Sequence, residues 1–265
     1  MGFNSSAQAY NPHMNRTPVA LKRDTIFECL FEIRFARRNQ SADELLPGIV
    51  FAGLKRHFTG VDPLPLAQLP KALRERDANL AYQPVQSLVG RNMRLMLGAR
   101  VATLSFTGQY SGWLNVRPLI EECIRAVLAT DIVGPVERCS LKYVNLLTDG
   151  KDAQDLGQLD LTLKLNGFPT GGAGTAIRTQ FELQGLTAIV DVTTDMTLIP
   201  PPDCGKGKGS GVMVNVDMIH AGPFADFAAE LPEILDKLHE LEKQVFFSLL
   251  TKPTLDRLGP IWTRQ

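Results

Sequence analysis

Two adjacent segments decide the fold class of this 265-residue chain: WLNVRPLIEECIRAVLAT at residues 113–130 and VERCSLKYVNLL at residues 136–147. The first segment predicts a helix with one apolar face, because its apolar residues recur every three or four positions. These residues are Val116, Ile120, Cys123, Ile124 and Val127. The second segment alternates in polarity and predicts a half-buried strand. A helix beside such a strand favours an α+β fold, in which other strands complete a sheet beneath the helix.

Residues 21–150 predict the order strand, helix, strand, strand, helix, strand. The elements before residue 113 are a strand at Ile26–Phe35, a helix at Leu46–Phe58, and a hairpin of Asn92–Leu97 with Val101–Phe106. The helix is placed so that Pro47 falls in its first turn, and residues 59–86 are expected to form a long connector. This order is that of a ferredoxin-like βαββαβ unit, an antiparallel sheet with two helices on one face.

Residues 151–265 predict a strand meander closed by a long C-terminal helix, packed as one unit with the first half. The expected strands are Leu159–Leu165, a hairpin of Thr175–Gln184 with Thr187–Thr194, and Val212–His220. The helix spans Glu230–Leu250, with Pro232 in its first turn. Residues 1–20 are polar and are expected to form a flexible arm.

Composition limits the class of protein. A hydrophobic content of 44% and a formal net charge of zero are typical of a globular domain and argue against nucleic-acid binding by bulk attraction. Residues 1–100 hold 14 Lys and Arg against 8 Asp and Glu, whereas residues 151–265 hold 10 against 15. This asymmetry suits head-to-tail self-association or a local anion site, and equally two solvated faces. Four dispersed cysteines and the lack of a long apolar run favour a reduced, cytoplasmic chain without a membrane span.

Four short motifs occur in a fixed order along the chain and carry a resemblance to other proteins. Glu32 and Arg34 lie in an E-I-R-F strand, Tyr110-x-x-Trp113 follows, Tyr143 and Asn145 lie in LKYVN, and Leu238-His239 precedes Phe246-Phe247. In this order they resemble a sporadically distributed family of uncharacterised prokaryotic proteins of similar length. The chain departs from the family pattern at Lys142, where arginine is usual. The patchy distribution implies cargo of mobile or defence-type gene cassettes, and no activity follows from it.

The most distinctive local pattern is CGKGKGSG at residues 204–211. Alternating glycines, including Gly207 and Gly209, free backbone N–H groups to surround an anion, and Lys206 and Lys208 add positive charge. The pattern is neither a phosphate-binding GxxxxGK[ST] loop nor a GxGxxG strand-to-helix turn. A plain hairpin connector explains it equally.

The aromatic and histidine residues carry no catalytic pattern. The histidines are scattered without metal-ligand spacing, so neither a metal nor a cofactor is expected. His239 is expected to be a packed or capping residue of the last helix. Trp113 with Tyr110 predicts a core anchor, the alternative being a base-stacking platform. The polar tips of Tyr143 and Asn145 are expected to satisfy buried hydrogen bonds.

Two hypotheses of function follow, and a third is kept beside them. The first is a non-catalytic interaction protein, such as a subunit, an immunity-like or an antitoxin-like factor, which binds a protein partner or forms a homo-oligomer. The second is an RNA- or nucleotide-binding or processing protein. Its phosphate contacts would be Lys206, Lys208, Gly207, Gly209, Arg34, Arg37 and Arg38. The third is a small-molecule hydrolase using His220 or His239.

Overall fold

The computed structural model describes residues 17–38, 42–78, 80–148, 155–164, 166, 174–200 and 207–262. Its helices are α1 (Ala42–Gly53), α2 (Lys71–Arg76), α3 (Trp113–Leu128), α4 (Phe227–Leu249) and α5 (Lys252–Leu258), with 3-10 turns η1 (Pro65–Gln68) and η2 (Leu156–Gln158). Its strands are β1 (Ala20–Leu21), β2 (Ile26–Arg37), β3 (Phe58–Pro63), β4 (Gln86–Gly90), β5 (Met93–Leu97), β6 (Val101–Thr107), β7 (Val133–Leu147), β8 (Ala176–Leu183), β9 (Leu186–Leu198), β10 (Gly209–Ala221) and β11 (Pro260–Ile261).

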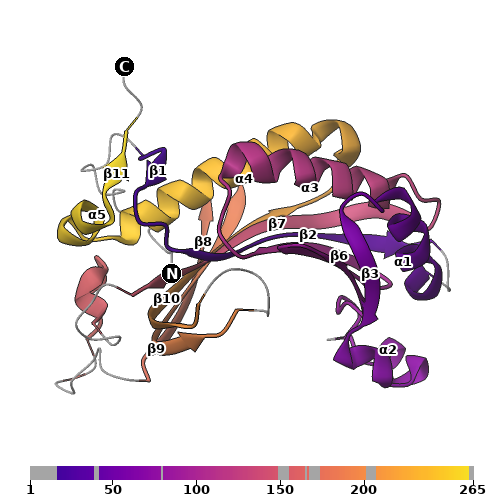
Figure 1. Ribbon diagram of the computed structural model, residues 1–265, viewed down its shortest axis with the longest axis horizontal. Coiled ribbons are helices and arrows are strands. Elements are labelled where there is room, and N and C mark those ends of the chain that lie inside the picture. The colour runs from indigo at the N-terminus through magenta and orange to yellow at the C-terminus, as the bar shows by residue number, and fades with distance from the viewer. Residues whose placement is uncertain are drawn as a thin grey trace, which may run out of the picture.

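One antiparallel sheet runs through both halves of the chain. Its nine strands lie in the order β3-β4-β5-β6-β2-β7-β10-β9-β8, and α3 and α4 lie side by side across one face (Figure 1). The join is the pair β7 and β10, which are in register from Val212 beside Leu147 to Ala221 beside Arg138. The predicted α+β class is therefore confirmed, and the strands of the second half extend the sheet of the first.

The front half contains more strands than the sequence predicts. The connector expected at residues 59–86 begins with β3 and leads into β4, and both extend the sheet beyond the predicted hairpin, which is present as β5 and β6. The ferredoxin-like βαββαβ unit is not confirmed in detail, because β3 and β4 come between α1 and that hairpin. The sheet also continues past β7 into the second half, so the unit is not a separate layer.

Prolines explain why the predicted starts of α1 and α4 differ from the observed ones. In α1, α3 and α4 a proline, respectively Pro47, Pro118 and Pro232, stands at the sixth helical position. Each proline costs one backbone hydrogen bond one turn into the helix, where buried apolar residues further along still hold the helix in place. The predictions that placed Pro47 and Pro232 in the first turn therefore began both helices too late.

Helix α4 begins with a reciprocal cap. The Asp226 carboxylate accepts a hydrogen bond from the Ala229 amide at 3.1 Å, while the Asp226 amide donates to the Glu230 carboxylate at 2.8 Å. The two bonds satisfy amide groups that the first turn of a helix leaves without partners. The cap fixes the start of α4 at Phe227, three residues before the predicted start.

The predicted strand Leu159–Leu165 is wrong. Among the described residues of this segment, Leu159 makes a single bridge to Leu250, and the Asp160 amide donates to the Leu249 carbonyl at 2.7 Å. The segment thus caps the end of α4 instead of joining a strand, which its alternating polarity did not reveal. The hairpin that follows is confirmed as β8 and β9, turning at Gln184 and Gly185, which both have positive φ angles.

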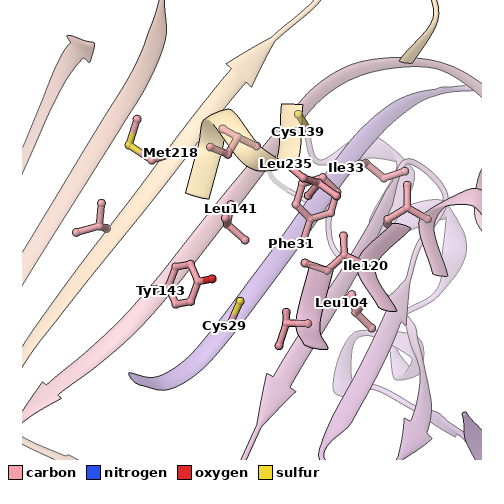
Figure 2. Packing of buried hydrophobic residues seen from close by; sticks show 14 of the residues in the cluster. Cys29, Phe31, Ile33, Leu104, Ile120, Cys139, Leu141, Tyr143, Met218 and Leu235 are labelled. Carbon is pink, nitrogen blue, oxygen red and sulfur yellow. The ribbon is translucent and has the colours of Figure 1, made fainter. Parts of the chain in front are cut away.

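The core lies between the sheet and the helices. Figure 2 shows Phe31, Ile33 and Leu141 from β2 and β7 beneath Leu235 of α4. Their side chains have exposed fractions of 0%. Cys29, Cys123 and Cys139 are free and buried in the same layer, whereas Cys204 lies outside the described residues. In the described part of the chain, no helix is both long and apolar enough to cross a membrane.

Candidate ligand-binding site

A cavity of about 320 Å³ opens at one end of this core, and we call it the aromatic pocket. It lies where the beginning of β2 and the end of β7 meet the beginning of α3 and the second half of α4, with β1 as a further wall. The residues that line it include Thr25, Ile26, Tyr110, Trp113, Tyr143, Asn145, His239, Glu242, Lys243, Phe246 and Phe247.

Local structure explains why these side chains converge. In β7, side chains alternate between the two faces of the sheet, so Tyr143 and Asn145 follow Leu141 on the face that carries α4. In α4, the three- and four-residue spacing of His239, Glu242 and Phe246 puts them on the face that meets the sheet. The strand and the helix therefore each deliver polar groups to the end of an apolar layer.

A chain of hydrogen bonds crosses the pocket wall. The hydroxyls of Tyr110 and Tyr143 are 2.9 Å apart, and the Tyr143 hydroxyl is 3.2 Å from Nδ1 of His239. The indole of Trp113 stacks on the His239 ring, with centroids 4.1 Å apart and planes 10° from parallel. Burial lowers the pKa of His239 to about 3, so the imidazole is neutral, and its Nδ1 shares one hydrogen bond with the Tyr143 hydroxyl.

The Trp113 side chain is held from outside the pocket by Asp236 of α4. The indole Nε1 donates to Oδ1 of Asp236 at 3.4 Å, and the guanidinium of Arg117 donates to both oxygens of the same carboxylate at 2.7 and 3.0 Å. These bonds join α3 to α4 beside the stacked pair. They orient the Trp113 ring over His239.

Two buried polar atoms in the pocket wall have no hydrogen-bond partner within the described part of the chain. One is Nδ2 of Asn145, whose residue is 1% exposed, and the other is Oε1 of Glu242, whose residue is 4% exposed. Thr25 donates to Oδ1 of Asn145 at 2.9 Å, which orients the amide so that its NH₂ group is the free end. Burial raises the pKa of Glu242 to about 8, so the uncharged acid predominates at neutral pH.

Leaving such groups without partners costs about 1–3 kcal/mol each, which native proteins rarely tolerate without a reason. Both atoms belong to residues that line one cavity, and the rest of the wall is mostly aromatic or aliphatic. An apolar cavity with a few convergent polar groups is the usual form of a small-molecule site, and this cavity falls within the common range of about 300–1,000 Å³. The aromatic pocket is therefore suited to binding a small molecule.

A second cavity, of about 340 Å³, adjoins the aromatic pocket. The two share Ile26, Tyr110 and Ser111 as lining residues. The second cavity is more basic, since Arg56 and Arg91 line it. Arg56 is bound to Glu122, whose carboxylate also lies 2.8 Å from Nε2 of His57.

The structure brings together five residues that the sequence singled out for their place in short motifs. They come from three of the four motifs, and all five line the aromatic pocket: Tyr110, Trp113, Tyr143, Asn145 and His239. His239 is indeed packed, and Tyr143 and the carbonyl oxygen of Asn145 have buried hydrogen bonds as predicted. Trp113 is partly buried against the core and also lines the pocket, while its interpretation as a base-stacking platform stays a prediction.

The remaining motif residues, Glu32 and Arg34, lie elsewhere. They point to the face of the sheet away from α3 and α4, where Nε of Arg34 is 2.7 Å from Oε1 of Glu32 and forms an ion pair with it. Arg34 also lies over the ring of Tyr82 at 4.9 Å. His220, the other candidate base, ends β10 and meets the ring of Phe224 at 5.0 Å.

The candidate phosphate contacts do not form one group. Lys206 lies outside the described residues, while Gly207 and Lys208 precede β10, whose first residue Gly209 pairs with Leu198. Arg37 pairs with Val133, at the opposite end of β7 from Leu147, and Arg38 follows it. A β-carbon at Gly211 would overlap the Leu147 carbonyl, so the close approach of the neighbouring strand already explains why this residue is glycine.

The sequence reading missed Glu242 and Thr25. Glu242 was recognisable, because it stands four residues after Leu238 and four before Phe246, so it interrupts the apolar face of the last helix with an acid. Thr25 gave no such signal, since a threonine before a strand has many ordinary uses. Its role depends on β2 and β7 being paired, which brings it to Asn145, 120 residues later.

In the described residues, no group of three or more His, Cys, Asp or Glu side chains is arranged to hold a metal ion. No protein-family model matches the chain, and a search of curated proteins found no similar sequence. The resemblance to a family of uncharacterised prokaryotic proteins stays a prediction.

Proposed function

We propose that the protein is a non-catalytic binding protein that takes a small molecule into the aromatic pocket. The observation that carries the proposal is the pair of buried polar atoms, Asn145 Nδ2 and Glu242 Oε1, in the wall of one apolar cavity. Stacked and edge-packed rings around them supply apolar area and a rigid frame, which is how small-molecule sites combine affinity with specificity.

The test is mass spectrometry under non-denaturing conditions on protein purified from its own cells. We expect a fraction of the protein to carry an added mass of small-molecule size, and Asn145→Leu to lose it. Asn215→Leu is the matched control, because Asn215 is a buried asparagine of the neighbouring strand β10 on the other face of the sheet. No added mass in the unaltered protein, or equal loss in both variants, would contradict the proposal.

The second candidate function, a protein that acts by binding a protein partner, is favoured by the sheet face away from α3 and α4. Three side-chain atoms there are buried without partners inside the described ranges: Arg138 Nε, Asn215 Oδ1 and Asp217 Oδ1. Lys142 stands opposite Asp217 in the register, so both signs of charge are present, which suits a polar protein surface better than a nucleic acid.

This candidate is tested by light scattering with size-exclusion chromatography at micromolar concentration. A mass above that of the monomer is expected, and Lys142→Glu should reduce it. Lys252→Glu, a change of the same kind at an exposed position of helix α5, is the control and should leave the mass unchanged. A monomer that binds no partner from its host would argue against this function and leave the pocket proposal intact.

A further inference from the structure

We infer that the ligand of the aromatic pocket is a flat molecule that carries an N–H group beside a C=O group, as in a cyclic amide, a ureide or the pairing edge of a nucleobase. This inference rests on the proposed function, because it names the class of ligand for the same site. It follows from the hydrogen-bonding capacity of the two free groups and from the shape of the pocket walls.

The first free group is a donor. Asn145 presents its NH₂ group because the hydroxyl of Thr25 already occupies the carbonyl oxygen, at 2.9 Å. Asn145 is 1% exposed, so bulk water does not satisfy its NH₂ group. A ligand that satisfies this group must offer an acceptor, such as a carbonyl oxygen.

The second free group is a carboxyl. Oε1 of Glu242 is buried without a partner, and an uncharged carboxylic acid both donates and accepts a hydrogen bond. Its natural complement is therefore a donor beside an acceptor. A ligand that satisfies both Asn145 and Glu242 therefore carries at least one N–H group and one C=O group.

The hydrogen-bonding groups, more than charge, define the ligand class. Burial raises the pKa of Glu242 and lowers the pKa of His239, so both are held neutral, while Asp24 and Lys243 also line the cavity. An ammonium ion has no acceptor and would leave the Asn145 donor unsatisfied. A carboxylate has no N–H group to offer to Oε1 of Glu242.

The walls favour a flat ring. Trp113 and His239 form a nearly parallel stack, and Tyr110 meets Tyr143 edge to face with centroids 5.7 Å apart. Such rings are fixed by one another and by hydrogen bonds, so the walls are rigid and planar. Rigid planar walls bury the two faces of a planar ligand while leaving its polar edge for hydrogen bonds.

Four probe molecules test the inference by calorimetric titration of the full chain: 2-pyridone, its N-methyl derivative, benzylammonium and benzoate. We expect 2-pyridone to bind and the N-methyl derivative to bind about tenfold more weakly, the usual effect of one lost hydrogen bond. Glu242→Gln, which keeps a donor and an acceptor, should retain affinity within a few-fold. Glu242→Met, of similar size, should lose about tenfold. Glu240→Met on the exposed side of α4 is the matched control.

The outcomes separate the inference from the proposed function. Stronger binding of benzylammonium or benzoate than of 2-pyridone, with loss in Glu242→Met, would overturn the ligand class and keep the pocket as a binding site. Equal binding of 2-pyridone and its N-methyl derivative would also overturn the ligand class. If none of the four binds and the purified protein carries no added mass, both the inference and the proposed function fail.

Discussion

The middle of the helix-covered face and its end are built from the same elements with opposite chemistry. At the middle, β2, β7 and α4 supply Phe31, Leu141 and Leu235, all with exposed fractions of 0%. A few residues further along the same elements come Asn145 and Glu242, buried to nearly the same extent but carrying polar atoms without partners. The comparison teaches that burial alone does not distinguish stability from function. The core and the aromatic pocket should therefore respond differently to substitution.

The largest effect is expected in the core. Phe31→Ala should lower the free energy of unfolding by about 4 kcal/mol, because it removes a fully buried ring and leaves a cavity. Urea unfolding measures the loss. Phe181→Ala on the edge strand β8 is the control, since that ring is 40% exposed and should cost less than about 1 kcal/mol. Similar losses in the two variants would show that β2 is not at the centre of the core.

The free energy of unfolding should depend on pH through Glu242, a residue that lines the aromatic pocket. Burial raises the pKa of Glu242 in the folded state to about 8, above the ordinary value of 4.5, so the folded state binds more protons than the unfolded state between these values. Stability is then lost as the pH rises through the folded pKa, by roughly 2 kcal/mol between pH 6.5 and 9. Urea unfolding at several pH values measures this loss, and the difference between the unaltered protein and Glu242→Gln isolates it. Parallel pH profiles for the two proteins would contradict it.

A smaller effect is expected at the far end of α4. Asp226→Ala removes the carboxylate that accepts from the Ala229 amide, keeps the backbone bond to Glu230, and should cost about 1 kcal/mol in unfolding experiments. Because the cap lies more than three helical turns before Glu242, the affinity of the pocket for 2-pyridone should not change. An altered affinity would mean that the pocket depends on the start of α4, and the two regions would not be separable.

The smallest effect on stability is expected at Asp236. Asp236→Asn weakens the ion pair with Arg117, which is partly exposed, so the cost should be about 0.5 kcal/mol or less. The fluorescence of Trp113, read in a Trp262→Phe background, should nevertheless change, because the indole loses a charged hydrogen-bond acceptor. An unchanged emission spectrum would show that Asp236 does not position the ring.

The sequence predicts the elements that carry a strong period and misses those that depend on distant partners. The helix at residue 113 and the strand at residue 136 follow from local spacing, and both are present. The segment Leu159–Leu165 has a strand-like period, but its hydrogen bonds go to the end of α4, which no local pattern specifies. The aromatic pocket also depends on distant partners. The sequence indicates its motif residues one motif at a time, but only the pairing of β2 with β7 and the packing of α3 and α4 bring them together.

The central strand β2 also implies a particular course of folding. Its neighbours are β6 and β7, and the side-chain hydrogen bonds that it and the preceding Thr25 make to them join residues 77 and 120 positions apart. Neither neighbour is local, so long loops must close before β2 gains any pairing, and such closures make folding slow. Early in refolding, β5 with β6 and β8 with β9 should protect their amides from hydrogen exchange, because each pair is joined by a short turn. Protection of β2 should arrive with the final, rate-limiting step.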